Sequence, residues 1–259
     1  MNDAKLLAGK QIVLTRSRHQ AGPLADLIRD FGGTPVSFPC IAIALPKELR
    51  PLDNCLRRLG EFDWLLLTSG NTASAIAERL SKLGIRLANT NIRVAAAGLA
   101  TADEARRRLS VDVQHIPADY GAGQLARSLP LSKACRLLLP QSDLAGASTA
   151  EILRARGAKV TTVVAYRTVI GAGGADLPAM ISRGEIDALT FTSPSAVAYF
   201  RKRCPSTVAL QLPAVCIGRS TAAVARKYGF RHLITPDQPT ISDMVAALAD
   251  YWASPSPTA

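Results

Sequence analysis

Small hydroxyl residues and glycines follow four of the apolar runs in this chain. Glycine lets a ligand approach the backbone closely, and Ser and Thr hydroxyls cap a following helix or donate to an anion. The four clusters are Thr68, Ser69, Gly70 and Asn71; Gly98 to Thr101; Thr192, Ser193, Pro194 and Ser195; and Gly218, Arg219, Ser220 and Thr221. These residue types indicate binding of an anionic ligand by hydroxyl and backbone N–H groups.

Any single cluster is explained at least as well as a helix N-cap, because Ser, Thr and Asn are preferred there. The position of the clusters points further. In open α/β sheets, ligands bind beyond the carboxyl ends of the strands, where the next helix presents free N–H groups and the positive end of its dipole. Four clusters in that position, paired across the chain, favour an anion-binding cleft between two lobes.

The sequence offers little other side-chain chemistry. His19, His115 and His232 lie far apart, without metal-ligand spacing and without a catalytic pair. The stretch GAGQLA at 121–126 follows no strand directly and lacks a third glycine, so it is a poor dinucleotide fingerprint. A P-loop and a Gly-x-Ser-x-Gly elbow are also absent from the sequence. We therefore expect no metal and no cofactor.

Strand and helix patterns alternate along the chain. QIVLT at 11–15, DWLLL at 63–67 and RLLLP at 136–140 are continuous apolar runs, and helical spacing follows the first of them. Continuous apolar strands between helices indicate a parallel sheet that is covered on both faces. The pattern predicts an α/β fold.

The two halves of the chain resemble each other in four stretches. Asp63 matches Asp187 and Gly98 matches Gly218, at offsets of 124 (187 − 63) and 120 (218 − 98) residues. Four matches at a nearly constant offset predict an internal duplication, with two Rossmann-like lobes of similar size. The segments near 37–50 and 161–171 are extended and β-branched, so we predict that they connect the lobes as a two-stranded β linker.

Composition and charge narrow the ligand class. The chain has 259 residues, a length that suffices for one large or two ordinary domains. Hydrophobic residues make up 48% of it, which is ordinary for a protein with a buried core. Its net charge of +11 attracts polyanions. However, only 5% of the residues are aromatic, which argues against base stacking, and the basic residues are scattered. We expect an acidic small molecule and no nucleic acid.

Cysteine usage and the start of the chain bear on the compartment. The five cysteines form no C-x-x-C pair, which argues against a disulfide framework or structural zinc and favours a reducing compartment. The start, MNDAKLLAGKQIVLTR, lacks an apolar core long enough for a signal peptide. No stretch approaches the roughly 18 apolar residues of a membrane span. These features predict a cytoplasmic protein without a membrane partner.

The stretches DWLLLTSGNTASAI, AAAGLATADEA, DALTFTSPSAVAYF and LLLPQSDLAGASTAEILRARGAKVTTVVAYRTV carry a family likeness. In their order and spacing the chain resembles the uroporphyrinogen-III synthase family over about residues 10–250. The resemblance implies two α/β lobes joined by a two-stranded ladder. Lobe one is expected at 1–37 with 170–259, lobe two at 46–161, and the connecting strands at 38–45 and 162–169.

The resemblance also implies a reaction, that of a lyase in haem and related tetrapyrrole biosynthesis. The substrate would be hydroxymethylbilane, a linear tetrapyrrole with eight carboxylates. The enzyme would remove its terminal hydroxyl as water, close the macrocycle and invert the last pyrrole through a spiro intermediate, without cofactor or metal. The product would be uroporphyrinogen III. Such catalysis depends on orientation and on exclusion of water.

Three further residues enter the candidate site. Tyr166 matches a tyrosine that the resemblance places near the leaving hydroxyl, as an acid or hydrogen-bond donor, although packing against a lobe explains a strand tyrosine equally well. Arg16, in LTRSR, matches a basic position of the family and would face the cleft; the alternative is a surface arginine at a strand end. We also place Ser142 among the substrate-binding residues.

Other functions fit parts of the pattern. Hinged α/β lobes with helix N-termini along a cleft also suit a non-catalytic cytosolic binding protein or sensor for an acidic small ligand. Nucleic-acid binding, suggested by the charge, predicts basic residues concentrated on one face rather than scattered. Our expectation is a monomer that acts on a small-molecule substrate, the linear tetrapyrrole polycarboxylate.

Overall fold

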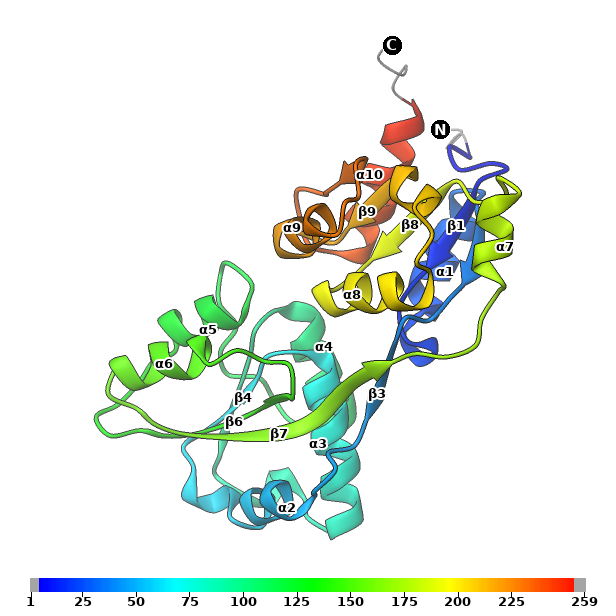
Figure 1. The fold of residues 1–259 in the computed structure, drawn as a ribbon. Coiled ribbons are helices and arrows are strands. Elements are labelled where there is room, and N and C mark those ends of the chain that lie inside the picture. Colours follow the sequence, from blue (N-terminus) through cyan, green and yellow to red (C-terminus); the bar gives the residue numbers. More distant parts are fainter. Residues whose placement is uncertain (1–4, 254–259) are drawn as a thin grey trace. The chain divides into compact units, whose positions relative to one another are not determined.

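The chain folds into two compact α/β units in the computed structural model, which describes residues 5–253 (Figure 1). Unit 1 comprises the described residues up to Ala42 together with those from Val169 onwards. Unit 2 comprises Ile43–Thr168. Each unit has its own predominantly parallel sheet, so each can be described by itself.

Unit 1 is built around a five-stranded sheet in the order β10-β9-β8-β1-β2, in which all neighbouring strands are parallel. One face packs on α8 and α9, and the other packs on α1 and α10. Its elements are β1 (Gln11–Leu14), η1 (Arg18–Gln20), α1 (Gly22–Asp30), β2 (Thr34–Ser37), α7 (Leu177–Ser182), β8 (Ala188–Phe191), α8 (Pro194–Arg203), η4 (Val208–Gln211), β9 (Ala214–Cys216), α9 (Arg219–Lys227), β10 (Leu233–Ile234) and α10 (Ile241–Ala253).

Unit 2 is built around a second five-stranded sheet, in the order β3-β7-β6-β4-β5. Helices α2, α3 and α4 pack on one face, and α5 and α6 pack on the other. Its elements are β3 (Ile41–Ala44), α2 (Arg50–Arg57), η2 (Leu59–Glu61), β4 (Trp64–Leu67), α3 (Gly70–Leu83), η3 (Leu87–Asn89), β5 (Arg93–Ala96), α4 (Leu99–Leu109), α5 (Ala122–Ser128), β6 (Arg136–Ser142), α6 (Ser148–Ala155) and β7 (Lys159–Ile170). The start of β3, up to Ala42, and the end of β7, from Val169, extend into unit 1.

The central strands β1, β4 and β8 are largely apolar because both of their faces are buried. Along β1, Val13 contributes to the cluster under α8 and α9, whereas Ile12 and Leu14 contribute to the cluster under α1 and α10. All three are at most 3% exposed. The alternation of side chains across a strand therefore fills both cores, and the α/β fold predicted from the continuous apolar runs is confirmed.

The two sheets have the same order of matched strands. The sequence repeats pair β1 with β6, β2 with β7, β8 with β4 and β9 with β5, and both sheets arrange these four strands identically. A single parallel bridge between Ala95 and His115 stands where unit 1 has the β9–β10 pair. This equivalence of topology agrees with the internal duplication in the sequence.

Strand β7 is one continuous strand of 12 residues, Lys159–Ile170. From the sequence, lobe two is expected to end at 161 and a separate connecting strand to span 162–169. The run KVTTVVAYRTVI is rich in β-branched residues and contains neither Gly nor Pro, so nothing in it interrupts the extended backbone.

Close packing in unit 1 fixes the segments that lead into β3 and out of β7. The N–H of Gly171 donates to the carbonyl of Cys40 at 2.8 Å, and a Cβ at Gly171 would lie only 2.2 Å from the Pro39 carbonyl oxygen. The guanidinium of Arg203 donates to the carbonyl oxygens of Pro39 and Gly173 and lies over the Phe38 ring, 4.1 Å from its centroid. Arg203 thus joins both segments to α8.

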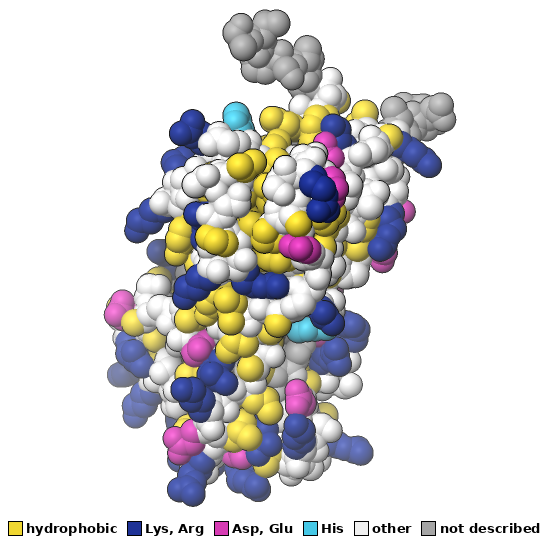
Figure 2. Space-filling view, turned by 45° about the vertical axis from the view of Figure 1, so that its right-hand side comes forward, with side chains coloured by type: hydrophobic (Ala, Val, Ile, Leu, Met, Phe, Trp, Pro, Cys, Tyr) yellow, Lys and Arg dark blue, Asp and Glu magenta, His cyan; other side chains and the backbone are white. Residues whose placement is uncertain are grey.

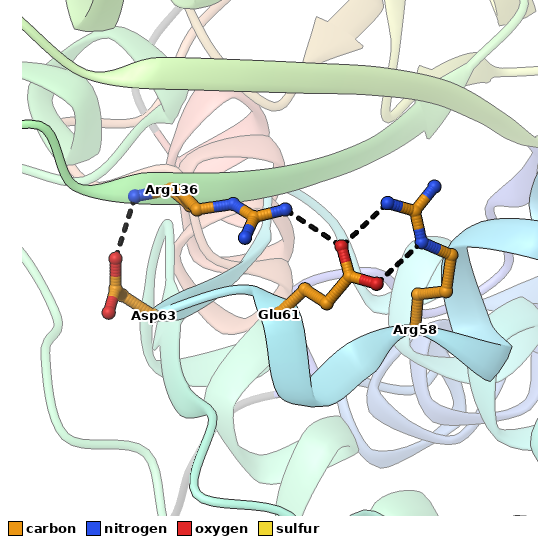
Figure 3. A network of polar contacts seen from close by, with 4 residues as sticks. All are labelled: Arg58, Glu61, Asp63 and Arg136. Carbon is orange, nitrogen blue, oxygen red and sulfur yellow. Dashed lines mark hydrogen bonds and ion pairs between the residues drawn. The ribbon is translucent and has the colours of Figure 1, made fainter.

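An ion-pair network lies at the amino-terminal edge of the sheet in unit 2 (Figure 3). Glu61 accepts from Arg58 and Arg136, and the backbone N–H of Arg136 donates to Asp63 at 2.7 Å. Arg58, and then Arg136, lower the pKa of the Glu61 carboxyl to about 2. The network joins the starts of β4 and β6, at the edge opposite to the hydroxyl clusters, so we assign it to stability.

On the face seen in Figure 2, positive and negative side chains do not form separate patches: Lys and Arg are spread out, with Asp and Glu between them.

Within residues 5–253, no helix has the length and apolar character needed to cross a membrane.

Candidate functional site

The predicted site residues lie at the carboxyl-terminal edges of the two sheets. The five strands of unit 1 run parallel, as do β4, β5, β6 and β7 in unit 2, so residues that follow different strands share one edge of each sheet. In unit 1, Arg16 follows β1, Thr192 and Ser193 follow β8, and Gly218 comes two residues after β9. The edge of unit 2 holds Thr68 and Ser69 after β4, Gly98 two residues after β5, and Ser142 as the last residue of β6.

Tyr166 and Ser69 form a hydrogen-bonded pair in unit 2. The Tyr166 hydroxyl lies 3.1 Å from Ser69 Oγ, although 97 residues separate the two in sequence. Ser69 Oγ also accepts from the backbone N–H of Thr72, which caps α3, and lies 3.0 Å from the Thr72 hydroxyl. Tyr166 is only 7% exposed. The site therefore contains a network of three hydroxyls next to the start of a 14-residue helix, in which Gly70 and Asn71 are the first residues.

Ser142 belongs to a second hydroxyl cluster in unit 2. Its Oγ lies 3.2 Å from Asp143 Oδ1 and 3.3 Å from the Thr168 hydroxyl, and it accepts from the backbone N–H of Leu144. Asp143 Oδ1 accepts from the backbone N–H of Thr168 at 2.9 Å. These bonds hold the end of β6 to β7. Asp143 is exposed, and the sequence analysis did not include it in the site.

Gly98 lies under an aromatic side chain that sequence reasoning missed. A Cβ at Gly98 would lie 3.3 Å from Cγ of Tyr120, and the N–H of Gly121 donates to the Ala97 carbonyl at 2.8 Å. Tyr120 is 44% exposed, so part of its ring faces solvent at the edge of the sheet. The signal in the sequence is an aromatic residue in IPADYGAGQLARSL (116–129), the stretch that resembles ITPDQPTISDMVAAL (234–248) in the other half of the chain. Thr101 is 9% exposed and lies on the core side of α4.

In unit 1, Ser193 caps α8 as the sequence pattern suggests. Its Oγ accepts from the backbone N–H of Ala196 at 3.2 Å and lies 3.1 Å from the Ser195 hydroxyl. Thr192, Ser193 and Ser195 are not fully buried, and Pro194 occupies the first turn, where its missing N–H costs no hydrogen bond. The capping interpretation therefore holds for this cluster, and it leaves the Thr192 and Ser195 side chains partly exposed.

Helix α9 begins without a side-chain cap. Gly218 is its N-cap residue, and Arg219 and Ser220 are exposed in the first turn. Thr221 is 1% exposed, and its backbone N–H donates to the Gly218 carbonyl at 3.1 Å. The cluster thus presents its backbone, Arg219 and Ser220 to solvent, while the Thr221 side chain is covered.

Arg16 has an unusual environment at the end of β1. Its Nε and Nη1 atoms are buried and have no hydrogen-bond partner among the described residues. Burial also lowers the pKa of its guanidinium below the usual value. The adjacent Thr15 and Ser17 are 0% and 2% exposed. Since a buried charge without a partner is costly, this side chain is suited to an anionic ligand.

The four buried cysteines do not add a nucleophile to the site. Cys40, Cys135, Cys204 and Cys216 are buried, and burial raises the pKa of the Cys216 thiol to about 12. A thiol with so high a pKa stays protonated at neutral pH. In the described part of the chain, no three His, Cys, Asp or Glu side chains come together as metal ligands.

Comparison with known proteins gives consistent matches. The family model for uroporphyrinogen-III synthase HemD matches residues 22–246. The chain is 29% identical to the porphyrin biosynthesis protein HemD of Ruminiclostridium josui over 252 residues, 95% of this chain and 49% of that protein. It is 28% identical to the uroporphyrinogen-III synthase of Synechococcus elongatus over 222 residues, 84% of this chain and 83% of the relative. The crystal structure of a mutant uroporphyrinogen III synthase from Thermus thermophilus has the same fold, with a TM-score of 0.64 at 21% identity, over 93% of this chain and 98% of that one.

Two α/β units with matched parallel sheets define a two-domain protein of the doubly wound α/β class. Since the family model covers most of its length, the chain belongs to the uroporphyrinogen-III synthase family, whose members are lyase-type cyclases. The resemblance noted in the sequence is confirmed. The chain spans about half the length, 49%, of the Ruminiclostridium relative.

Proposed function

We propose that this protein cyclises hydroxymethylbilane, with inversion of the last pyrrole ring and loss of water, to give uroporphyrinogen III. Membership of the uroporphyrinogen-III synthase family supports the reaction. The observation that carries the choice of an acidic substrate is the buried guanidinium of Arg16, whose Nε and Nη1 have no acceptor among the described residues. A carboxylate arm of the substrate would supply that acceptor.

Site roles follow from this proposal. The hydroxyl and glycine clusters hold carboxylates through backbone N–H groups, and Tyr166 donates a hydrogen bond or a proton to the leaving hydroxyl. Residues 38–45 and 162–169 connect the two lobes, and the protein acts in the cytoplasm as a monomer. Two features support the site roles: each cluster lies at a carboxyl-terminal sheet edge, and the Tyr166 hydroxyl lies beside Ser69.

A product assay tests the reaction. The purified protein is mixed with hydroxymethylbilane, the products are oxidised, and the porphyrin isomers are resolved. We expect isomer III in excess, because without an enzyme the substrate closes without inversion and gives isomer I. Isomer I alone would contradict the proposal and would leave the non-catalytic binding protein as the better explanation.

Arg16→Ala is expected to raise KM by about 10- to 100-fold while kcat stays within about threefold, the pattern for lost uniform binding. Steady-state kinetics with hydroxymethylbilane measure both constants. Arg29→Ala is the matched control, because Arg29 is an exposed arginine in the last turn of α1 that forms an ion pair with Asp26. A fall in kcat at unchanged KM would argue against a binding role for Arg16.

A further inference from the structure

A cavity of about 640 Å³ opens in unit 1 beside α9. Arg219, Ala222 and Arg226 line it, and their spacing of three and four residues places them on one face of the helix. Ile217 and Gly218 close the end near β9, and Thr235, Pro236, Asp237 and Pro239 form the opposite wall. We call this cavity the α9 pocket.

The α9 pocket holds two arginines and one carboxylate. Arg219, Arg226 and Asp237 are all exposed. Among the described residues, no hydrogen bond or ion pair is made by the guanidinium of Arg219 or of Arg226, with Asp237 or with any other side chain. The small side chain of Ala222 separates the two arginines along the helix face that lines the pocket. An excess of positive charge, with apolar walls at Ile217 and Pro236, suits an anion that carries an apolar stem.

The duplicated unit provides an internal comparison. At the offset of 120 residues that relates Gly98 to Gly218, Leu99 stands for Arg219 and Arg106 stands for Arg226. Leu99 is uncharged and 52% exposed. Arg106 already has a partner, since its Nη1 donates to Asp103 at 2.8 Å. The equivalent face of α4 therefore lacks both unpaired arginines.

The loops opposite the two helices also differ. In unit 2, Tyr120 packs against Gly98 so closely that an added Cβ would be 3.3 Å from its ring. The nearest atom to an added Cβ at Gly218 is Cβ of Pro239, at 3.8 Å. The backbone at Gly98 is thus covered by the ring of Tyr120, whereas the backbone at the equivalent Gly218 lines the α9 pocket.

We propose that the α9 pocket binds one carboxylate arm of the substrate, with Arg219 and Arg226 as a two-point grip on the carboxylate. The identity of the arm, an acetate or propionate on a pyrrole, rests on the function proposed above. Two guanidinium groups match a carboxylate through charge-assisted hydrogen bonds, and the apolar walls contact the methylene stem. The pocket makes this sheet edge selective for an acidic side chain, in addition to the contact offered by Arg16.

Binding of a stable octacarboxylate tests the pocket without requiring turnover. Uroporphyrin I carries the same kinds of acidic arm and is followed by its fluorescence during titration with protein. We expect the double variant Arg219→Gln/Arg226→Gln to raise the Kd at least about tenfold. The control Arg29→Gln/Arg106→Gln removes two positive charges that already have carboxylate partners, and its Kd should stay within about twofold of wild type.

The outcomes separate the pocket from the reaction. An equal Kd for the double variant and the wild type would overturn the proposal, as would an equal rise in the control or the absence of binding by the wild type. Unchanged melting temperatures establish that both variants are folded. If the wild type yields only isomer I but the Kd difference is present, the proposed reaction fails and the carboxylate pocket stands.

Discussion

Tyr166→Phe is expected to lower kcat about 10²-fold, at the lower end of the usual range for a general acid or a directed hydrogen bond. The substitution removes only the hydroxyl, which lies 3.1 Å from Ser69 Oγ, and keeps the ring that packs in the core of unit 2. Formation of isomer III from hydroxymethylbilane measures the effect. The structural cost is one hydrogen bond, about 1 kcal/mol, so the variant should remain folded.

Two further variants define what the Tyr166 result means. Tyr228→Phe is the matched control, because Tyr228 is a 42% exposed tyrosine that follows α9, and it should retain wild-type kcat. Ser69→Ala leaves the Tyr166 hydroxyl in place without this neighbour, so its kcat should lie between wild type and Tyr166→Phe. Full activity in Tyr166→Phe would remove the hydroxyl from the mechanism and leave Tyr166 as a packing residue.

Phe200→Ala is expected to destabilise unit 1 by about 3–5 kcal/mol, the usual cost of truncating a buried phenylalanine. Phe200 on α8 is 0% exposed. Its ring packs against Phe38, Phe191 and Phe230, with centroids at 6.1, 5.3 and 5.9 Å. Because domains are stable by only about 5–15 kcal/mol, this loss is a large part of the total. The aromatic cluster therefore holds α8, and with it the Ser193 cap, against the sheet.

Urea unfolding measures this effect in one unit at a time. The chain has two tryptophans, Trp64 in unit 2 and Trp252 in unit 1. In a Trp64→Phe background, fluorescence reports unit 1 through Trp252, which packs against the cluster of α1 and α10. Val208→Ala is the control, since Val208 is 55% exposed and its loss should change the free energy of unfolding by less than about 0.5 kcal/mol. A similarly small change for Phe200→Ala would contradict this role of the cluster.

Much of the architecture could be predicted from local pattern. Continuous apolar runs predicted strands that are covered on both faces, and β4 and β8 are indeed buried at every position. The repeats then predicted two similar units, since each repeat contains its own strands and helices. The point at which β7 leaves the sheet and becomes the connecting segment could not be predicted. Its β-branched residues form one continuous strand, and no Gly or Pro marks a boundary between the two parts.

The candidate site was predictable in its residue types but not in its contacts. Small hydroxyls at strand ends pointed to helix caps and anion binding, and Ser69 and Ser193 are caps in the structure. Asp143 was missed because nothing in its local sequence sets it apart, and Tyr120 was missed because an aromatic residue in IPADYGAGQLARSL does not by itself indicate which backbone it packs on. Tyr120 matters through its packing on Gly98, which comes from a different strand end.

The sequence by itself determined the fold class, the repeated order of elements, the basic character and the small hydroxyl residues at strand ends. All of these can be read from composition or from local pattern along the chain. Only the tertiary structure shows that Tyr166 contacts Ser69, 97 residues away in sequence. It also shows that two nitrogens of Arg16 are buried without an acceptor among the described residues. Finally, it places a basic pocket beside α9, whereas Tyr120 packs against Gly98 at the start of α4. Such contacts depend on strand order and on what each side chain packs against, which local spacing does not specify.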